Sequence, residues 1–216
     1  MSLALLSSLG RPAAGEAEGA PLLIHGRGAD EHDLAPLADV LDPERRLAVY
    51  LPRGPLALPP GGAHWYVVAR VGFPDADTFF PTFELLSAWT DAAVADAGVG
   101  PDRLVLAGFS QGAVMSYALG LAAGRPRPAA ILAMSGFVPR VDGFDLELES
   151  RAGLRVSISH GSLDPIIGVG FGREARDRLT AAGLDVVYRE DPVGHTIAPA
   201  ALVQAKATLE RALSLS

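Results

Sequence analysis

Short apolar runs alternate with amphipathic segments along the chain. The runs are typical of strands buried in a parallel sheet, and they lie at residues 21–24, 47–51, 104–107, 130–134, 154–159 and 184–188. Apolar residues with helical spacing fall between or after them, at residues 34–41, 77–97, 111–123, 173–182 and 200–213. Parallel strands need crossover connections, which helices provide. The pattern therefore predicts an α/β fold with a mostly parallel central sheet and helices on both faces.

Two segments near the start lack this regular spacing. The leucine-rich run at residues 3–9 is predicted to form an N-terminal strand that turns back at Gly10. The same run is similar to the core of a short signal peptide, but no positively charged segment precedes it, so we expect the strand and a cytoplasmic protein. Residues 52–62 are rich in proline and glycine, which predicts an irregular loop.

Composition argues against several classes of protein. A length of 216 residues with 49% hydrophobic and 20% charged residues suits one globular domain over residues 1–216. The net charge of −7 and the single lysine, Lys206, argue against a nucleic-acid partner. The absence of cysteine excludes disulfides and thiolate metal sites. No later stretch reaches the roughly 18 uncharged apolar residues that a membrane span requires.

The candidate nucleophile is Ser110. It stands in Gly108-Phe109-Ser110-Gln111-Gly112, between a predicted strand and a predicted helix. This is the arrangement of a nucleophile elbow, in which a sharp turn exposes the serine hydroxyl and the glycines let two backbone segments pass closely. The motif is short enough to occur by chance, so its value depends on the partners found elsewhere in the chain.

A nucleophilic serine needs a histidine base and a carboxylate that orients the histidine. In α/β-hydrolases the acid and then the histidine follow the serine along the chain. Asp164 and His195 occur in this order, each on a loop after a predicted strand, and His195 is the only histidine downstream of Asp164. Asp191 stays open as an alternative acid, and Asp142 and Asp145 are weaker alternatives.

Acyl transfer also needs hydrogen-bond donors for the developing oxyanion. The backbone N–H of Gln111, directly after the serine, is the first candidate. The second is the backbone N–H of Arg27, because Gly26 and Gly28 on either side free the loop to face the site. Alternatively, the two glycines form only a turn.

Other side chains have two interpretations each. His25 and His160 precede glycines at strand ends, but no third ligand with suitable spacing accompanies them, so we expect hydrogen bonds to loop backbone rather than a metal site. Trp65 and Tyr66 either wall the acyl pocket or pack in the core. The Arg27 guanidinium at the site mouth would favour an acidic group on the substrate, unless it is simply solvated.

Taken together, these motifs resemble the phospholipase/carboxylesterase family of α/β-hydrolases, which includes acyl-protein thioesterases and small bacterial carboxylesterases. The matching pieces lie at residues 25–28, 108–112, 135–139, 160–165 and 194–195. The resemblance implies that Ser110, Asp164 and His195 form a triad. It also implies that Arg27 and Gln111 hold the oxyanion and that Trp65, Tyr66 and Phe137 contact the substrate.

The chain departs from the family's pattern before Pro21, at Val67 and at Gly168. These positions lie in or near loops that contact substrate, so the reaction type is predicted more firmly than the substrate.

We therefore expect a minimal α/β-hydrolase without a separate cap domain, which hydrolyses carboxylic esters and needs no metal or organic cofactor. The expected partner is a small-molecule or lipid-like ester with a short to medium acyl chain, and the sequence allows a homodimer. An acyl-protein thioesterase, a lysophospholipase, and a dienelactone-hydrolase-like or peptide-cleaving enzyme remain alternatives. A non-catalytic binding module on a hydrolase scaffold is the alternative from another class.

Overall fold

A seven-stranded sheet forms the centre of the protein. The computed structural model describes residues 3–215, and the strand order in the sheet is β1-β3-β2-β8-β9-β10-β11. The strands are β1 (Ser8–Arg11), β2 (Ala20–Ile24), β3 (Val49–Pro52), β8 (Leu104–Phe109), β9 (Ala130–Met134), β10 (Arg155–Gly161) and β11 (Asp185–Asp191). Only β1 pairs antiparallel, with β3, and every other neighbouring pair is parallel. The predicted α/β fold with a mostly parallel sheet is confirmed.

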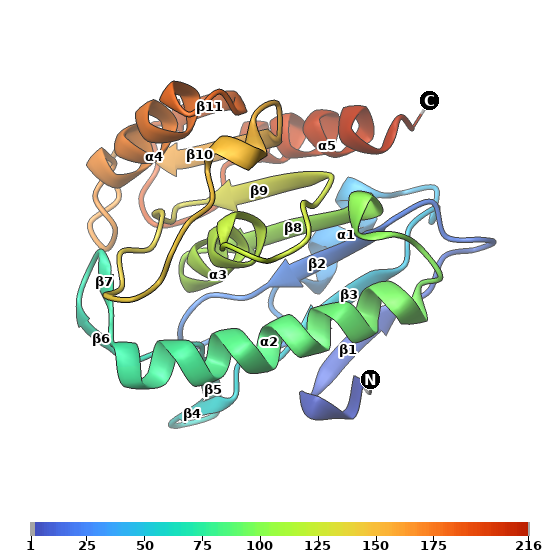
Figure 1. Cartoon of the computed structure of the whole chain (residues 1–216), viewed down its shortest axis with the longest axis horizontal. Coiled ribbons are helices and arrows are strands. Elements are labelled where there is room, and N and C mark those ends of the chain that lie inside the picture. Colours follow the sequence, from blue (N-terminus) through green and yellow to red (C-terminus); the bar gives the residue numbers. More distant parts are fainter. Residues whose placement is uncertain (1–2, 216) are drawn as a thin grey trace.

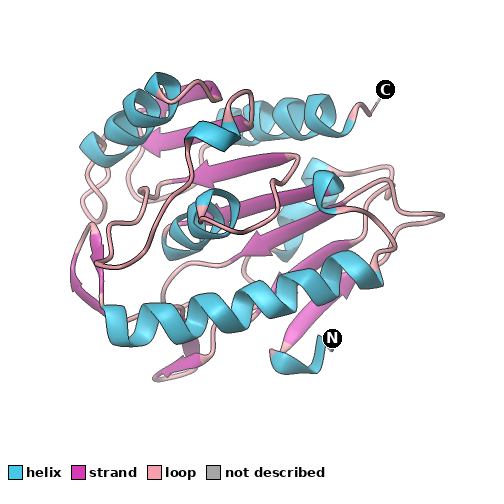
Figure 2. Cartoon of the chain, viewed as in Figure 1, coloured by secondary structure: helices cyan, strands magenta, loops and turns pink. Residues whose placement is uncertain are grey.

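Helices cover both faces of this sheet (Figures 1 and 2). They are α1 (Ala35–Leu41), α2 (Ala76–Asp96), α3 (Gln111–Leu121), α4 (Gly170–Ala181) and α5 (Pro199–Leu213). Successive strand residues point to opposite faces. Leu22 and Ile24 accordingly pack in the cluster that includes residues of α2 and α3, whereas Leu23 packs with α1 and α5. Residues of α4 join a third cluster, on the α3 side of the sheet.

The prediction for the N-terminal run was only partly right. Residues Leu3–Leu5 form a 3-10 helix, and the strand is confined to β1. The Trp89 indole N–H of α2 donates a hydrogen bond to the Leu3 carbonyl at 3.1 Å, and Leu6 is buried in the same cluster as Trp89. Leu3 and Leu6 therefore pack against α2 rather than extend along the sheet edge.

The prediction of an irregular loop at residues 52–62 was wrong in part. These residues contain β4 (Leu56–Leu58), which pairs antiparallel with β5 (Gly62–His64) to form a hairpin. A second hairpin, β6 (Val68–Arg70) with β7 (Phe73–Pro74), was also not predicted. Figure 1 shows β6 and β7 beside the start of α2. Both hairpins have strands of three residues or fewer, which is too short for a hydrophobic period to be recognised.

The carboxyl ends of four parallel strands bring the predicted site residues to one edge. β10 and β11 run past their expected ends, because the backbone ladder continues through polar pairs such as His160 with Glu190. Residue 25 follows β2, residue 110 follows β8, and the loops after β10 and β11 carry residues 164 and 195. This is the edge at which open α/β sheets bind ligands. Within residues 3–215, no helix is long and apolar enough to cross a membrane.

Candidate active site

Ser110 lies on a strained turn between β8 and α3. Its φ of 55° and ψ of −119° lie outside the regions that L-residues usually occupy. A Cβ on Gly108 would come within 2.3 Å of the Gly112 backbone, and one on Gly112 would lie 1.8 Å from the Ile24 carbonyl oxygen. Only glycine fits at these two positions. The close approach of α3 to β2 and β8 thus depends on the two glycines of the motif.

Three side chains from separate loops form a continuous hydrogen-bonded chain. The Ser110 hydroxyl lies 2.9 Å from His195 Nε2, and His195 Nδ1 lies 2.7 Å from Asp164 Oδ2. Because Nδ1 faces a carboxylate, it carries the ring proton and donates it, which leaves Nε2 to accept from the hydroxyl. The Phe109 ring packs against the imidazole, with the ring centroids 4.8 Å apart. The structure therefore brings the three predicted residues together in the order that serine activation requires.

Asp164 is held as a carboxylate by its own loop. Its Oδ1 accepts the backbone N–H groups of Ile166 and Ile167, both at 2.9 Å. Burial alone would raise the pKa of Asp164, but the hydrogen bonds from His195 and from these two N–H groups outweigh it and lower the pKa below its usual value. The Asp164 side chain therefore stays charged and fixed beside His195.

The alternative acids lie elsewhere. Asp191 accepts hydrogen bonds from the Arg189 guanidinium, the shortest at 2.7 Å, and makes none to His195 within the described chain. Asp142 and Asp145 are exposed.

The two predicted oxyanion donors lie on either side of the serine. Neither the Arg27 nor the Gln111 backbone N–H bonds to another described residue, which leaves both free to donate to a ligand. The Gln111 side chain accepts from Trp65 N at 3.0 Å and donates to the Tyr66 carbonyl at 2.9 Å. Gly28 N donates to the Ala63 carbonyl at 2.8 Å, which fixes the loop that carries Arg27.

A pocket of about 360 Å³ opens beside Ser110 and Gln111. Tyr66 and Phe137 line it, as the sequence suggested. Trp65 does not: it is fully buried, and its indole N–H donates to the His25 carbonyl at 2.8 Å. Tyr66 is the member of this aromatic pair that faces the pocket.

Sequence reasoning missed much of the pocket wall. The additional lining residues come from the β6–β7 hairpin and from the loop after Asp164, and they are Val68, Arg70, Val71, Ile166 and Ile167. The apolar pair directly after Asp164-Pro165 was a usable signal, because large apolar residues on a loop at the sheet edge need a contact. The hairpin gave no comparable signal, since its strands are too short to show a period.

His25 and His160 bond to loop backbone. His25 donates from Nδ1 to the Gly26 carbonyl at 2.7 Å, and its Nε2 accepts the Gly54 N–H at 2.9 Å. His160 donates from Nε2 to the Ile167 carbonyl at 2.7 Å and lies 3.6 Å from Asp164 Oδ2. Burial lowers the pKa of both histidines, so both are held neutral. His160 thereby ties the loop of Asp164 to β10.

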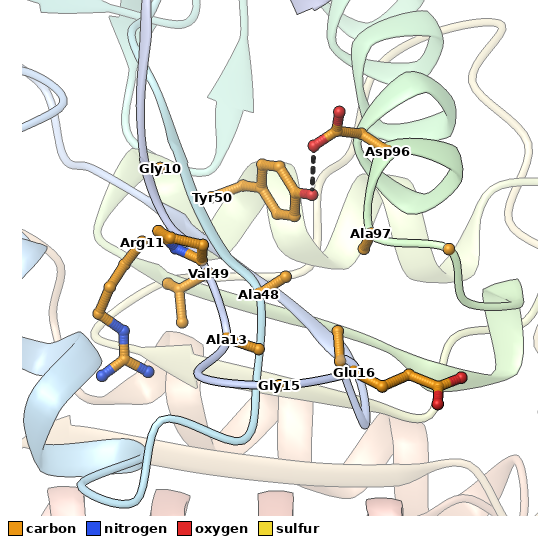
Figure 3. A pocket seen from close by; sticks show the side chains of 13 residues that line it. Gly10, Arg11, Ala13, Gly15, Glu16, Ala48, Val49, Tyr50, Asp96 and Ala97 are labelled. Carbon is orange, nitrogen blue, oxygen red and sulfur yellow. Dashed lines mark hydrogen bonds between the residues drawn. The ribbon is translucent and has the colours of Figure 1, made fainter.

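A larger pocket, of about 480 Å³, lies away from these residues (Figure 3). It is lined by the end of β1, the start of β3 and the end of α2, so it lies at the opposite end of the parallel strands from Ser110. Figure 3 shows the Tyr50 hydroxyl pointing to Asp96, with which it forms a hydrogen bond of 2.7 Å. None of the predicted site residues lines this pocket. Size alone is therefore a poor guide to the site in this protein.

Comparison with known proteins agrees with this geometry. The family model described as Phospholipase/Carboxylesterase matches residues 12–213. The acyl-protein thioesterase 1 of Gibberella zeae is 26% identical over 99% of this chain and 98% of its own length. The esterase YpfH of Escherichia coli is 28% identical over 64% of this chain and 58% of its own length.

A solved structure shows the same similarity in three dimensions. The carboxylesterase of Bacillus cereus superposes with a TM-score of 0.84 and 25% identity, over 97% of this chain and 95% of that one. The family match covers most of the sequence, and the six strands from β2 to β11 of the central sheet, the elbow and the hydrogen-bonded side chains lie within it. The chain belongs to the phospholipase/carboxylesterase family.

Proposed function

We propose that the protein is a serine esterase that hydrolyses carboxylic esters through an acyl-enzyme intermediate. The observation that carries this proposal is the hydrogen-bonded chain Ser110–His195–Asp164 at the wall of a pocket. Family membership supports the same activity. A binding module would have no need of a strained serine aligned with a base and a buried carboxylate, so catalysis is favoured over the non-catalytic alternative.

Each residue has one role in the proposed reaction. Ser110 Oγ attacks the ester carbonyl carbon while its proton passes to His195 Nε2, and the ester C–O bond then breaks as Nε2 returns that proton to the leaving alcohol. A water molecule next attacks the acyl-enzyme and gives a proton to Nε2, which passes to Ser110 as the acid leaves. Asp164 stays ionised throughout and stabilises the imidazolium that forms twice.

The backbone N–H groups of Arg27 and Gln111 are proposed to hold the oxyanion. Donors of this kind act where negative charge develops, and each contributes about 3 kcal/mol to the stability of the transition state. The buried side chain of Gln111, bonded to the backbone of residues 65 and 66, supports this role by keeping the start of α3 in place.

The pocket favours short to medium acyl groups. Its volume is about 360 Å³, and Tyr66 and Phe137 give it an aromatic wall that excludes water from an acyl chain. Thioesters remain an alternative substrate class, because the Gibberella zeae relative is an acyl-protein thioesterase, and lysophospholipids remain a further one. A single domain over residues 1–216, a cytoplasmic location and a homodimer stay predictions of the sequence.

A substrate panel tests the proposal. The purified protein should hydrolyse p-nitrophenyl esters and matched thioesters of graded acyl length, with the highest kcat/KM among short to medium esters. Ser110→Ala should lower kcat by about 10⁴-fold or more. Ser162→Ala is the matched control, since Ser162 is exposed on the loop of Asp164, and it should keep its activity. Equal rates for the wild type and Ser110→Ala would contradict the proposal.

A further inference from the structure

Two arginine residues line the pocket beside Ser110. Arg27 comes from the loop after β2, and Arg70 comes from the end of β6. Both side chains belong to exposed residues. Among the described residues, no aspartate or glutamate lines the same pocket, so the charged groups found there are positive. This is unexpected in a chain whose net charge is −7.

Arg27 has no carboxylate partner in the described part of the chain, although acidic residues follow it closely in sequence. Asp30 and Glu31 lie instead against Arg53, whose Nη1 is 3.5 Å from Asp30 Oδ2 and 2.9 Å from Glu31 Oε2. No described carboxylate oxygen lies within 4.0 Å of the Arg27 guanidinium. The acids that would neutralise Arg27 are thus occupied by another arginine.

Arg70 is positioned by an aromatic ring, and no carboxylate of residues 3–215 forms an ion pair with it. Its Cζ lies 3.6 Å from the centroid of the Phe73 ring in the same hairpin. A ring face attracts the cation but accepts no hydrogen bond from the edge of the guanidinium. The nearby Asp75 is used as the N-cap of α2 and accepts the Thr78 N–H at 3.1 Å. The N–H edge of Arg70 therefore remains available to an anion.

Apolar side chains line the same pocket as the two arginines and the reacting serine. Val68, Val71, Ile166 and Ile167 line the pocket together with the two arginines. A ligand that fits this surface has an apolar stretch beside the ester and a negative group that reaches a guanidinium. Arginine binds carboxylates with paired N–H donors.

We propose that the pocket is specific for esters that carry a free carboxylate, bound by Arg70 with the Arg27 guanidinium contributing. This inference rests on the proposed esterase function and adds the substrate class. Because both arginines are exposed, water and salt weaken the attraction, and we expect a preference of about threefold to tenfold in kcat/KM over the neutral counterpart. The preference appears mainly in KM, since the carboxylate is bound equally before and during the reaction.

Matched pairs of esters test this specificity. The first pair is p-nitrophenyl hydrogen adipate and p-nitrophenyl methyl adipate, which place the charge on the acyl side. The second pair is 4-(butanoyloxy)phenylacetate and its methyl ester, which place it on the alcohol side. The ratio of kcat/KM, charged over neutral, should exceed one for at least one pair, and it should fall as the salt concentration rises.

Substitutions identify the residues behind that ratio. Arg70→Gln should lower it towards one, Arg70→Lys should keep part of it, and Arg70→Glu should bring it below one. Arg27→Gln, which retains the backbone N–H, should lower it as well. Arg127→Gln is the control with the same charge change, since Arg127 is exposed just before β9, away from the site, and it should keep the wild-type ratio.

The outcomes separate this inference from the esterase function. If the wild type cleaves none of the four esters, the proposed function itself is contradicted. If it cleaves the neutral esters with ratios at or below one, or if Arg70→Gln and Arg127→Gln give the same ratio, only the carboxylate specificity is overturned.

Discussion

At the scale of single residues, one substitution tests whether Asp164 orients His195. Asp164→Asn can keep the carbonyl oxygen that accepts from Ile166 and Ile167, but its NH₂ group would donate to His195 Nδ1. His195 would then carry its proton on Nε2 and could not accept from Ser110. We expect kcat to fall by about 10⁴-fold with little change in KM, measured by steady-state kinetics on a neutral p-nitrophenyl ester.

Asp191→Asn is the matched control for this substitution. Asp191 is the last residue of β11 and lies close to His195 in sequence, but its partner is Arg189. It should retain most of the wild-type kcat. A loss for Asp191→Asn as large as that for Asp164→Asn would contradict the assignment of the acid.

Residue types and order were enough to predict which side chains meet Ser110. The chain has a serine at an elbow, an acid and a single downstream histidine, and each follows a strand. In a parallel sheet these three side chains then have few ways to lie other than together at one edge. The exposure of neighbouring side chains was not predictable in the same way. Trp65 and Tyr66 are adjacent, and only tertiary contacts, such as the bond from the Trp65 indole to the His25 carbonyl, decide which one faces the pocket.

At the scale of elements, the contact between α3 and β2 should tolerate no side chain at Gly112. A Cβ there would lie 1.8 Å from the Ile24 carbonyl oxygen, and backbone cannot move as a flexible side chain does. Gly112→Ala should lower the free energy of unfolding by about 1–3 kcal/mol, as measured by urea denaturation.

Gly168→Ala provides the comparison for that experiment. Its added Cβ would meet nothing within 4 Å, so the unfolding free energy should change by less than about 0.5 kcal/mol. If both substitutions lower the free energy of unfolding by the same amount, close packing at the elbow is not the reason that residue 112 must be glycine.

Elements with strong periodicity were predictable, and short ones were not. The prediction of a helix at residues 77–97 agrees closely with α2 (Ala76–Asp96), because a long amphipathic stripe specifies a helix by itself. The β6–β7 hairpin has only five residues in its two strands. It supplies Arg70 to the pocket, so the part of the site with the weakest sequence signal is the part that carries the proposed substrate specificity.

At the scale of the whole molecule, buried histidines should make stability depend on pH. Burial lowers the pKa of His25 and of His160 in the fold, whereas both take up protons near pH 6.5 once unfolded. Below that pH the unfolded chain binds more protons, so the free energy of unfolding should fall as the solution is acidified. Each histidine contributes up to about 1.4 kcal/mol per pH unit, which urea denaturation between pH 7.5 and pH 5.5 would measure.

A comparison of His160→Gln with the wild type isolates the contribution of His160. His160→Gln should reduce the slope of unfolding free energy against pH. If His160→Gln does not fold, the protonation of His160 can be followed by NMR in the wild type. A His160 that becomes charged above pH 6.5 in the folded protein would contradict the account.

The alternation of strands and helices predicted the molecule's architecture and the edge where the site lies. It did not predict the larger pocket, at the end of α2, because that pocket forms from segments with no chemical motif. The position of Ser110 at the carboxyl ends of the strands distinguishes the pocket of the site from this larger pocket.

The central claim is that Ser110 is an activated nucleophile, and covalent labelling tests it most directly. The native protein, treated with a fluorophosphonate and examined by intact mass and peptide mapping, should gain one adduct, located on Ser110. Ser162→Ala should be labelled like the wild type, and Ser110→Ala should gain none. A native protein without an adduct, or an equal adduct on Ser110→Ala, would contradict the claim.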